Sequence, residues 1–296
     1  MASTQQIKGR IKSVKNTKQI TKAMELVAAS KMRRAQETTV ASREYVRTAR
    51  QILAKLRQLT DVSKHPLFAV REVKSRIIVV ITSDRGLAGA YNSNVLRQLT
   101  KELQADEEAG VRTELITIGK QAAKFVAKID GVNVLASYDN MPERPSITDL
   151  STILVTVKDA YRSDDGTEKT TDAVDILYTD YKSSVVQEVT QQRLLPAADE
   201  LTRSDHVVND LKDAIFEPSP KEVLETISDR LVDVQLWQAY LESQASEQSS
   251  RMMAMKTASD NAGDLIDDLT LEMNSARQAA ITQELAEIVG GAEAIK

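Results

Sequence analysis

The sequence predicts an α/β protein combined with a coiled coil: an antiparallel pair of long N- and C-terminal helices with a Rossmann-like α/β domain inserted between them. At both ends of the chain, apolar and small residues recur at alternating spacings of three and four over many turns. Between the ends, short apolar runs alternate with helical segments, which is typical of an open, mainly parallel sheet. We therefore expect a first long helix within residues 1–62, the α/β domain within 63–218 and a second long helix within 219–296.

The N-terminal helix is predicted from Thr4 to about Thr60, a stretch with no proline and with Gly9 as its only glycine. This is far longer than the usual helix of about 11–12 residues. Pro66 ends the pattern. The residues that follow the helical spacing are Ile7, Ile11, Val14, Met24, Val27, Ala28, Ala35, Thr39, Ser42, Val46, Ala49, Leu53 and Leu56.

The C-terminal helix has a defined start. Ser219 is expected as the N-cap, Pro220 as the first helical residue and Glu222 as the acid of a capping box. A repeat with a strict period of 3.5 residues then runs from Leu224 to Ala280, which imposes a left-handed supercoil against a partner helix. Gly290-Gly291 is expected to end the helix.

Neither long helix has a partner beside it in the sequence, so the simplest arrangement pairs the two with each other. Two separate helical bundles are the alternative, but they require wider apolar faces than a two-per-seven stripe. Small residues along the seam allow close approach of the backbones: Ala35, Ala49, Ala245, Ala262 and Ala276.

The central segment is predicted to contain five strands and three helices. The strands are expected at Ile77–Ile81, Glu114–Ile118, Val132–Tyr138, Ala173–Tyr178 and Ser184–Arg193, and the helices at Asn92–Glu108, Lys120–Ile129 and Ile147–Arg162. Residues 163–169 are expected to form a polar, hairpin-like turn.

The composition excludes several classes of protein. There are no cysteines, and hence no disulfide, thiol catalysis or thiolate metal site. No apolar run reaches the roughly 18 residues needed to span a bilayer, and no signal peptide is visible. His65 and His206 lie in separate polar stretches and are interpreted as ordinary loop residues, so a metal site is not expected.

The net charge of −4 conceals an asymmetry between the two ends of the chain. Residues 1–60 carry 14 Lys and Arg against 3 acidic residues, whereas residues 221–296 carry 6 against 14. Nine cations lie between Lys8 and Arg34, with Glu25 as the only acid among them. Two interpretations stay open: a nucleic-acid backbone or an acidic protein surface. No aromatic residue interleaves the cations, which favours the protein surface.

The segment "SDRGLAGA" follows the first predicted strand and precedes a helix, which is where nucleotide-binding proteins hold phosphates. A dinucleotide fingerprint needs three glycines and an acid after the second strand. Here only Gly86 and Gly89 are present, no Walker lysine follows, and the second strand ends in Gly119-Lys120 without the acid. We interpret Gly86 and Gly89 as a structural turn that brings the helix close to the sheet, with nucleotide binding as the alternative. No catalytic constellation and no cofactor site can be assembled from the sequence.

Three segments resemble one known family. "IKGRIKSVKNTKQITKAMELVAASKMRRAQ" at residues 7–36 resembles the N-terminal helix of the γ subunits of F-type ATP synthases. "ARQAAITQELAEIVGGA" in the last helix resembles their C-terminal signature, and "SDRGLAGAYN" matches the start of their central domain. The resemblance covers essentially the whole chain.

The resemblance implies a non-catalytic rotor shaft. In this family the helix pair lies inside a ring of three alpha and three beta subunits, and the central domain rests on the membrane c-ring beside the epsilon subunit. Rotation couples proton flow to ATP synthesis or hydrolysis on the beta subunits. It implies no cofactor, no metal and no nucleic-acid partner, and a peripheral position on the cytoplasmic side of a bacterial cell membrane. The cysteine pair of chloroplast members is absent, so their redox switch is not expected.

The resemblance also implies contacts with the beta subunits at particular positions. The residues that match the family's belt facing the acidic loops of the beta subunits are Lys22, Met24, Lys31, Arg33 and Arg34. Those that match its C-terminal contact or rotor-stabilising positions are Arg251, Arg277, Gln278, Thr282, Glu284 and Glu287.

Overall fold

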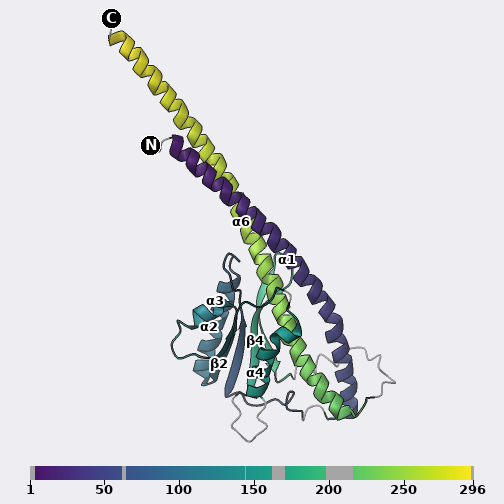
Figure 1. The fold of residues 1–296 in the computed structure, drawn as a ribbon. Helices are drawn as coiled ribbons and strands as arrows, with labels where there is room; N and C mark the ends of the chain where they lie inside the picture. The colour runs from purple at the N-terminus through teal and green to yellow at the C-terminus, as the bar shows by residue number, and fades with distance from the viewer. Residues whose placement is uncertain (1–3, 62–64, 144, 162–170, 198–215, 295–296) are drawn as a thin grey trace. The chain divides into compact units, whose positions relative to one another are not determined.

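A computed structural model of the chain describes residues 4–61, 65–143, 145–161, 171–197 and 216–294 and divides the chain into two compact units. The first unit consists of Met1–Ala29 with Arg251–Lys296, and the second of Ser30–Ser250. Helices α1 (Thr4–Leu59) and α6 (Pro220–Ala294), which are labelled in Figure 1, each contribute residues to both units. The predicted turn at 163–169 and His206 lie outside the described residues.

In the first unit, the beginning of α1 packs against the later part of α6. Ile7, Ile11 and Leu269 form its buried core. Because the earliest apolar residues of α1 meet late residues of α6, the two helices run antiparallel, as the sequence predicts. Val14, Ile266, Met273 and Ala276 pack around this core.

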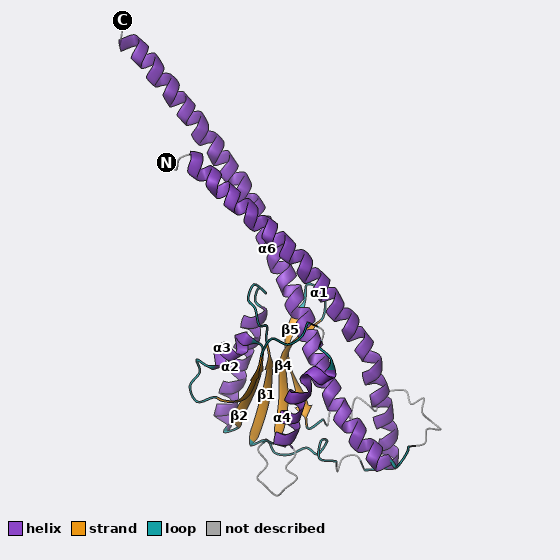
Figure 2. Ribbon diagram, in the orientation of Figure 1, coloured by secondary structure: helices purple, strands orange, loops and turns teal. Residues whose placement is uncertain are grey.

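The second unit is built on a five-stranded sheet with the order β3-β2-β1-β4-β5 (Figure 2). Strands β1 to β4 are all parallel, whereas β5 is antiparallel to β4, so the prediction of a mainly parallel sheet is confirmed. The strands are β1 (Ser75–Ile81), β2 (Arg112–Ile118), β3 (Asn133–Tyr138), β4 (Ala173–Tyr181) and β5 (Gln187–Leu195).

The helices between the strands differ from expectation mainly at their ends. They are α2 (Tyr91–Ala109), α3 (Lys120–Val126), a 3₁₀ turn η2 (Ile147–Leu150) and α4 (Ser151–Tyr161). Helix α3 is shorter than the predicted Lys120–Ile129, because the amide of Lys128 bonds to the carbonyl of Phe125 and tightens the last turn.

Helices cover both faces of the sheet. On one face, Val95 and Leu99 of α2 and Ala122 of α3 pack against Ile78 and Val80. The core on the other face joins the sheet to α4 and also to α6, which contributes Val232, Leu236, Ala239 and Tyr240. Helix α6 is therefore part of the α/β core, an arrangement that the sequence did not predict.

The same part of α6 also packs against α1. Leu53 and Leu56 of α1 form a separate core with Leu224 and Leu231 of α6. The neighbouring residues Leu231 and Val232 thus belong to two different cores, one shared with α1 and one shared with the sheet.

The ends of α6 give one confirmed prediction and one correction. The amide of Glu222 donates to Oγ of Ser219 over 3.3 Å, as expected for an N-cap. The prediction that Gly290-Gly291 ends the helix is wrong, because α6 continues to Ala294. Glycine inside a helix costs only about 1 kcal/mol relative to alanine, and no proline follows to stop it.

His65 lies in a loop, as interpreted from the sequence, and it is buried, since only 7% of its surface is accessible. Its Nδ1 accepts from the amide of Leu67, so Nε2 carries the proton and donates to the carboxylate of Glu225 over 3.0 Å. Among the helices that the structure describes, none is both long enough and apolar enough to cross a bilayer.

Candidate functional site

The predicted contact residues are divided between the two units. Lys31, Arg33 and Arg34 lie in α1 within the second unit. The remaining residues, on α1 and α6, belong to the first unit: Lys22, Met24, Arg251, Arg277, Gln278, Thr282, Glu284 and Glu287.

The last described turns of α6 have no partner within the described part of the first unit. Its core ends at Ala276, and every residue from 277 to 290 is exposed. The polar side chains here bond within the helix: Thr282 donates to the carbonyl of Gln278, and Gln283 donates to Glu287. This segment is a free helical surface in the isolated chain.

Apolar side chains on this segment were missed by the sequence-based prediction. Ile281, Leu285 and Ile288 are spaced by four and three residues, so they share one face of α6, and they are 50%, 57% and 68% exposed. Val289 beside them is 63% exposed. An apolar stripe of this kind indicates a protein contact. The signal was present in the sequence as a second run of apolar residues spaced by four and three, shifted by one position from the stripe that ends at Ala280.

The predicted belt residues of α1 are partly paired along their own helix. Lys22 lies 3.0 Å from Glu25, and Arg33 lies 3.1 Å from Glu37. Exposed pairs of this kind stabilise a helix by only about 0.3–0.5 kcal/mol. The cations of Lys22 and Arg33 are therefore available to an acidic partner at little cost.

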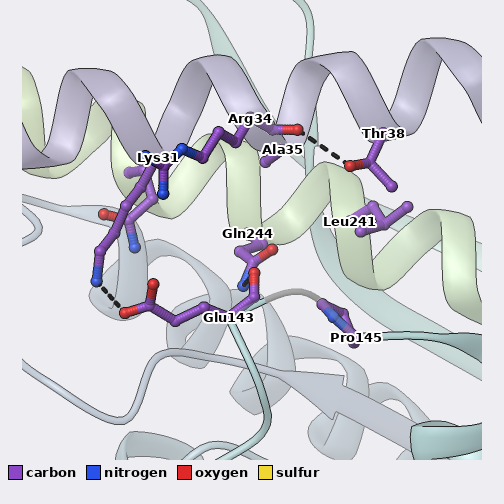
Figure 3. Close-up of a pocket in the computed structure, with 9 residues that line it drawn as sticks. Lys31, Arg34, Ala35, Thr38, Glu143, Pro145, Leu241 and Gln244 are labelled. Atoms are coloured by element: carbon purple, nitrogen blue, oxygen red, sulfur yellow. Dashed lines mark hydrogen bonds and ion pairs between the residues drawn. The ribbon is translucent and has the colours of Figure 1, made fainter.

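Lys31 and Arg34 border a cavity of about 80 Å³ between α1, α6 and the loop before η2 (Figure 3). The ammonium of Lys31 contacts the carboxylate of Glu143 in that loop. The hydrogen bond from Lys31 lowers the pKa of Glu143; partial burial opposes this, and the charges of Lys31, Arg34 and Arg85 add to it. This pairing could not be read from sequence, because the two residues are 112 positions apart.

The loop between β1 and α2 contains the two glycines interpreted as a structural turn. Gly89 has a positive φ of +55°, and Leu87, two residues before it, has a positive φ of +61°. Glycine adopts a positive φ without cost. A Cβ added at Gly86 would meet no atom within 4 Å, so close packing does not require glycine there.

A carboxylate of the chain itself lies at the strand ends beside this loop. Asp84 follows β1, and its two oxygens accept from the amides of Lys120 and Asn140 over 3.1 and 3.0 Å. These amides lie after β2 and β3, so Asp84 ties three strand ends together. A negative charge that already uses these donors disfavours a bound phosphate.

The charged cluster on the sheet is structural. Arg76 of β1 is buried and pairs with Glu102, Asp106 and Asp175, and Arg193 also pairs with Asp175. Each charge has an opposite partner, as a buried network requires. Within the described residues, no group of His, Asp or Glu side chains is arranged to hold a metal ion.

Comparison with known proteins gave full-length matches. A family model described as ATP synthase matches residues 3–295. The ATP synthase gamma chain of Legionella pneumophila (strain Corby) is 39% identical over 299 residues, and that of Acidithiobacillus ferrooxidans (strain ATCC 53993) is 41% identical over 295; each match covers 100% of both chains.

Similar solved structures come from rotary assemblies. A chain from the central stalk and c-ring of Tetrahymena thermophila mitochondrial ATP synthase has a TM-score of 0.60 at 25% identity, covering 81% of this chain and 99% of that one. A chain of the Euglena gracilis mitochondrial ATP synthase has a TM-score of 0.68 at 20% identity, covering 99% and 94%. The second likeness supports the fold alone.

Proposed function

Because the chain belongs to the gamma-chain family of ATP synthases, we propose that it is the central rotor shaft of an F1Fo ATP synthase. Its partners are the alpha and beta subunits, the epsilon subunit and the membrane c-ring. Rotation of the chain couples proton flow through the membrane sector to ATP synthesis or hydrolysis at the beta subunits.

The observation that carries this proposal is the free end of α6. Residues 277–290 continue beyond the core that α6 forms with α1, and they combine an apolar stripe with polar positions that resemble the family's contact residues. A helix with an exposed apolar face is stabilised when a partner covers that face. A ring of alpha and beta subunits provides such a cover.

The chain is not itself catalytic in this proposal. It acts by presenting different faces to the three beta subunits as it turns, so that each nucleotide site passes through different affinities. The carboxylate of Asp84 in the loop after β1, and the absence of the third glycine, support a turn in place of a nucleotide site.

The cations of the belt provide exchangeable contacts with acidic loops of the beta subunits. Exposed ion pairs contribute only about 0–1 kcal/mol each, so they can be broken and remade as the shaft turns. A deeply buried pair would hold the shaft at one angle, because its separation leaves unpaired charges. We assign this role to the cations Lys22, Lys31, Arg33 and Arg34, and we assign to the uncharged Met24 a contact with the beta subunits beside them.

The C-terminal residues provide the second set of contacts. Residues 277–290 are exposed in the chain alone, which leaves these positions accessible to the ring. We assign contact with the beta subunits, or stabilisation of the rotor, to Arg251, Arg277, Gln278, Thr282, Glu284 and Glu287.

The α/β domain, within residues 63–218, is assigned to the foot that contacts the epsilon subunit and the c-ring. The complex places the chain at the periphery of a bacterial cell membrane on its cytoplasmic side. The two long helices, within 1–62 and 219–296, form the shaft.

A pull-down from native membranes tests the proposal. The tagged chain should retain the alpha, beta and epsilon subunits, with a tagged unrelated coiled coil as the control. If these subunits do not co-purify, the rotor assignment is lost.

Titration calorimetry with ATP, ADP and NAD tests the alternative of a nucleotide-binding enzyme. Micromolar binding to the isolated chain that is lost when Gly86 or Gly89 is replaced would support that alternative. Retention on DNA at physiological salt would support the nucleic-acid interpretation of the basic helix.

A further inference from the structure

Two predicted contact residues already face an acid within the chain. The Nζ of Lys31 contacts the carboxylate of Glu143, which lies in the loop between β3 and η2 (Figure 3). Arg34, one turn along α1, borders the same cavity. Among the described residues that line this cavity, Glu143 is the only acid.

The loop that carries Glu143 is anchored to α6 by two hydrogen bonds. Gln244 donates to the carbonyl of Glu143 over 3.3 Å, and the indole of Trp237 donates to the carbonyl of Pro145 over 2.8 Å. Both bonds hold backbone atoms, so they fix the position of the loop without using the carboxylate. The backbone that carries the carboxylate of Glu143 is therefore held in place beside α1, so the contact with Lys31 does not depend on two freely moving side chains.

The charges around Glu143 are unbalanced. Lys31, Arg34 and Arg85 all lower the pKa of this carboxylate, and the described lining of the cavity carries two cations, Lys31 and Arg34, against the single acid Glu143. The side chain of Glu143 is 67% exposed and that of Lys31 is 34% exposed. A second anion can therefore approach from solvent, and a single carboxylate does not neutralise the site.

We propose that Glu143 is an internal counter-anion for Lys31 and Arg34, and that an acidic loop of the beta subunit displaces it when the chain binds the ring. This step rests on the proposed function, because it requires the acidic partner. One carboxylate replaces another at the same cations, so the charge pairing is conserved during the exchange. The cost of separating Lys31 from its internal partner is offset by the new contact.

The exchange lowers the affinity of the ring for this part of the shaft. An exposed pair is worth only about 0.2–1 kcal/mol, so removing the internal competitor should tighten binding by a factor between about 1.4 and 5. The effect should decrease at high ionic strength, because exposed charges are screened.

The first experiment tests the pairing in the full-length chain alone. Lysine amines are labelled by reductive ¹³C-methylation, and the NMR signal of Lys31 is followed through an acid titration. The signal should move as Glu143 takes up a proton, and this movement should be absent in Glu143→Gln. A Lys31 signal that is the same in both proteins would overturn the pairing.

The second experiment measures binding to a preassembled hexamer of alpha and beta subunits. Glu143→Gln should bind more tightly than the wild type at low salt, by a factor between about 1.4 and 5. The matched control is Glu108→Gln, which removes the same charge from an exposed position on α2. If the two variants increased the affinity for the hexamer equally, the increase would come from the change in net charge alone. That outcome would overturn the proposed displacement.

The two experiments separate the two proposals. If Lys31 senses Glu143 but no variant binds the hexamer, the rotor function fails, and the displacement fails with it. If the wild type binds normally and Glu143→Gln leaves the affinity unchanged, the rotor function stands and only the displacement by the beta subunit is overturned.

Discussion

The hydroxyl of Tyr91 lies 2.7 Å from the hydroxyl of Ser243, and both side chains are buried. This bond joins the first residue of α2 to α6. We expect Tyr91→Phe to lower the free energy of unfolding by about 1–2 kcal/mol, because the buried hydroxyl of Ser243 loses this partner. Urea denaturation followed by the fluorescence of Trp237, the only tryptophan of the chain, measures the change.

Two further variants isolate this bond. The double variant Tyr91→Phe with Ser243→Ala should cost less than the sum of the two single changes, because each single change leaves one buried group unpaired. Tyr45→Phe removes a hydroxyl from a half-exposed position and should change stability by less than about 0.5 kcal/mol. Strict additivity in the cycle would show that the two hydroxyls do not interact.

Gly119 is required by close packing at the end of β2. Its φ is +97°, and a Cβ there would lie 2.2 Å from the carbonyl oxygen of Thr82. Backbone atoms cannot move aside cheaply, so Gly119→Ala should destabilise the chain by about 3 kcal/mol or more. The matched variant Gly86→Ala places the same methyl where no atom lies within 4 Å and should be tolerated. Comparable urea midpoints for the two variants would contradict this.

Gly263 lies in the interior of α6, where alanine would favour the helix. In the described part of the chain, a Cβ here would meet Nζ of Lys18 at 2.7 Å and Cε of Lys18 at 3.6 Å, and this flexible side chain can move. Gly263→Ala should therefore stabilise the helix locally by about 0.5–1 kcal/mol. Hydrogen exchange of the α6 amides around this position should slow accordingly.

Gly9→Ala provides the comparison for this change. A Cβ at Gly9 meets nothing within 4 Å, so it should give a gain of the same size in α1. If amide hydrogen exchange became faster in Gly263→Ala but slower in Gly9→Ala, the prediction for Gly263 would be wrong. The side chain of Lys18 would then be unable to move away from the added methyl group.

Asp172 should make the start of β1 sensitive to acid. Partial burial raises its pKa, but hydrogen bonds from the amides of Lys74 and Ser75 and from the hydroxyl of Ser75 outweigh this and lower the pKa overall. A folded-state pKa below the unfolded one means that the folded chain binds fewer protons. The stabilisation is therefore complete above the ordinary aspartate pKa of about 3.9 and is lost as the pH falls below it.

Asp172→Asn tests this pH dependence. At neutral pH the variant should be less stable than the wild type by about 1 kcal/mol, and the difference should shrink as the pH falls below about 4. Asp130→Asn, at an exposed position, should show no such difference. A gap between Asp172→Asn and the wild type that stays constant down to acid pH would rule out the carboxylate as its source.

The apolar stripe on α6 should matter for assembly and not for the stability of the chain. Leu285→Gln alters a side chain that is 57% exposed, so the free energy of unfolding should change by less than about 0.5 kcal/mol. Binding to the hexamer of alpha and beta subunits should weaken by about tenfold or more, because covering a leucine contributes about 1.5–3 kcal/mol. Sedimentation of the mixture measures the fraction bound.

The control for the stripe is Val70→Gln, which alters a 76% exposed apolar residue outside both long helices. It should leave binding unchanged. Equal binding of Leu285→Gln and the wild type would show that the ring does not cover this face.

Much of the fold could be predicted from local patterns. The spacing of Ile7, Ile11, Leu53 and Leu56 identified the seam of α1, since residues three and four apart share one side of a helix. The short apolar runs identified the five described strands. The buried run Ile77–Ile81 lies in the central strand β1, where both faces are covered and a continuous apolar run is expected.

What could not be predicted depends on contacts between distant parts of the sequence. Val232 and Leu236 lie outside the coiled-coil stripe of α6, and nothing local indicates that the sheet covers them. The pairing of Lys31 with Glu143 has the same origin, because it joins α1 to a loop after the third strand. The persistence of α6 through Gly290 shows that propensity alone does not end a helix.

The double use of α6 has a mechanical consequence. Leu231 is bound into the core with α1, and the next residue, Val232, into the core of the sheet. No flexible linker separates these two attachments, so a twist applied to the sheet reaches the helix directly. Protein interiors are closely packed, so these two cores deform little when a force is applied to them. The second unit should therefore behave as a rigid coupling, and the compliance of the rotor must reside in other parts of the complex or along its helices.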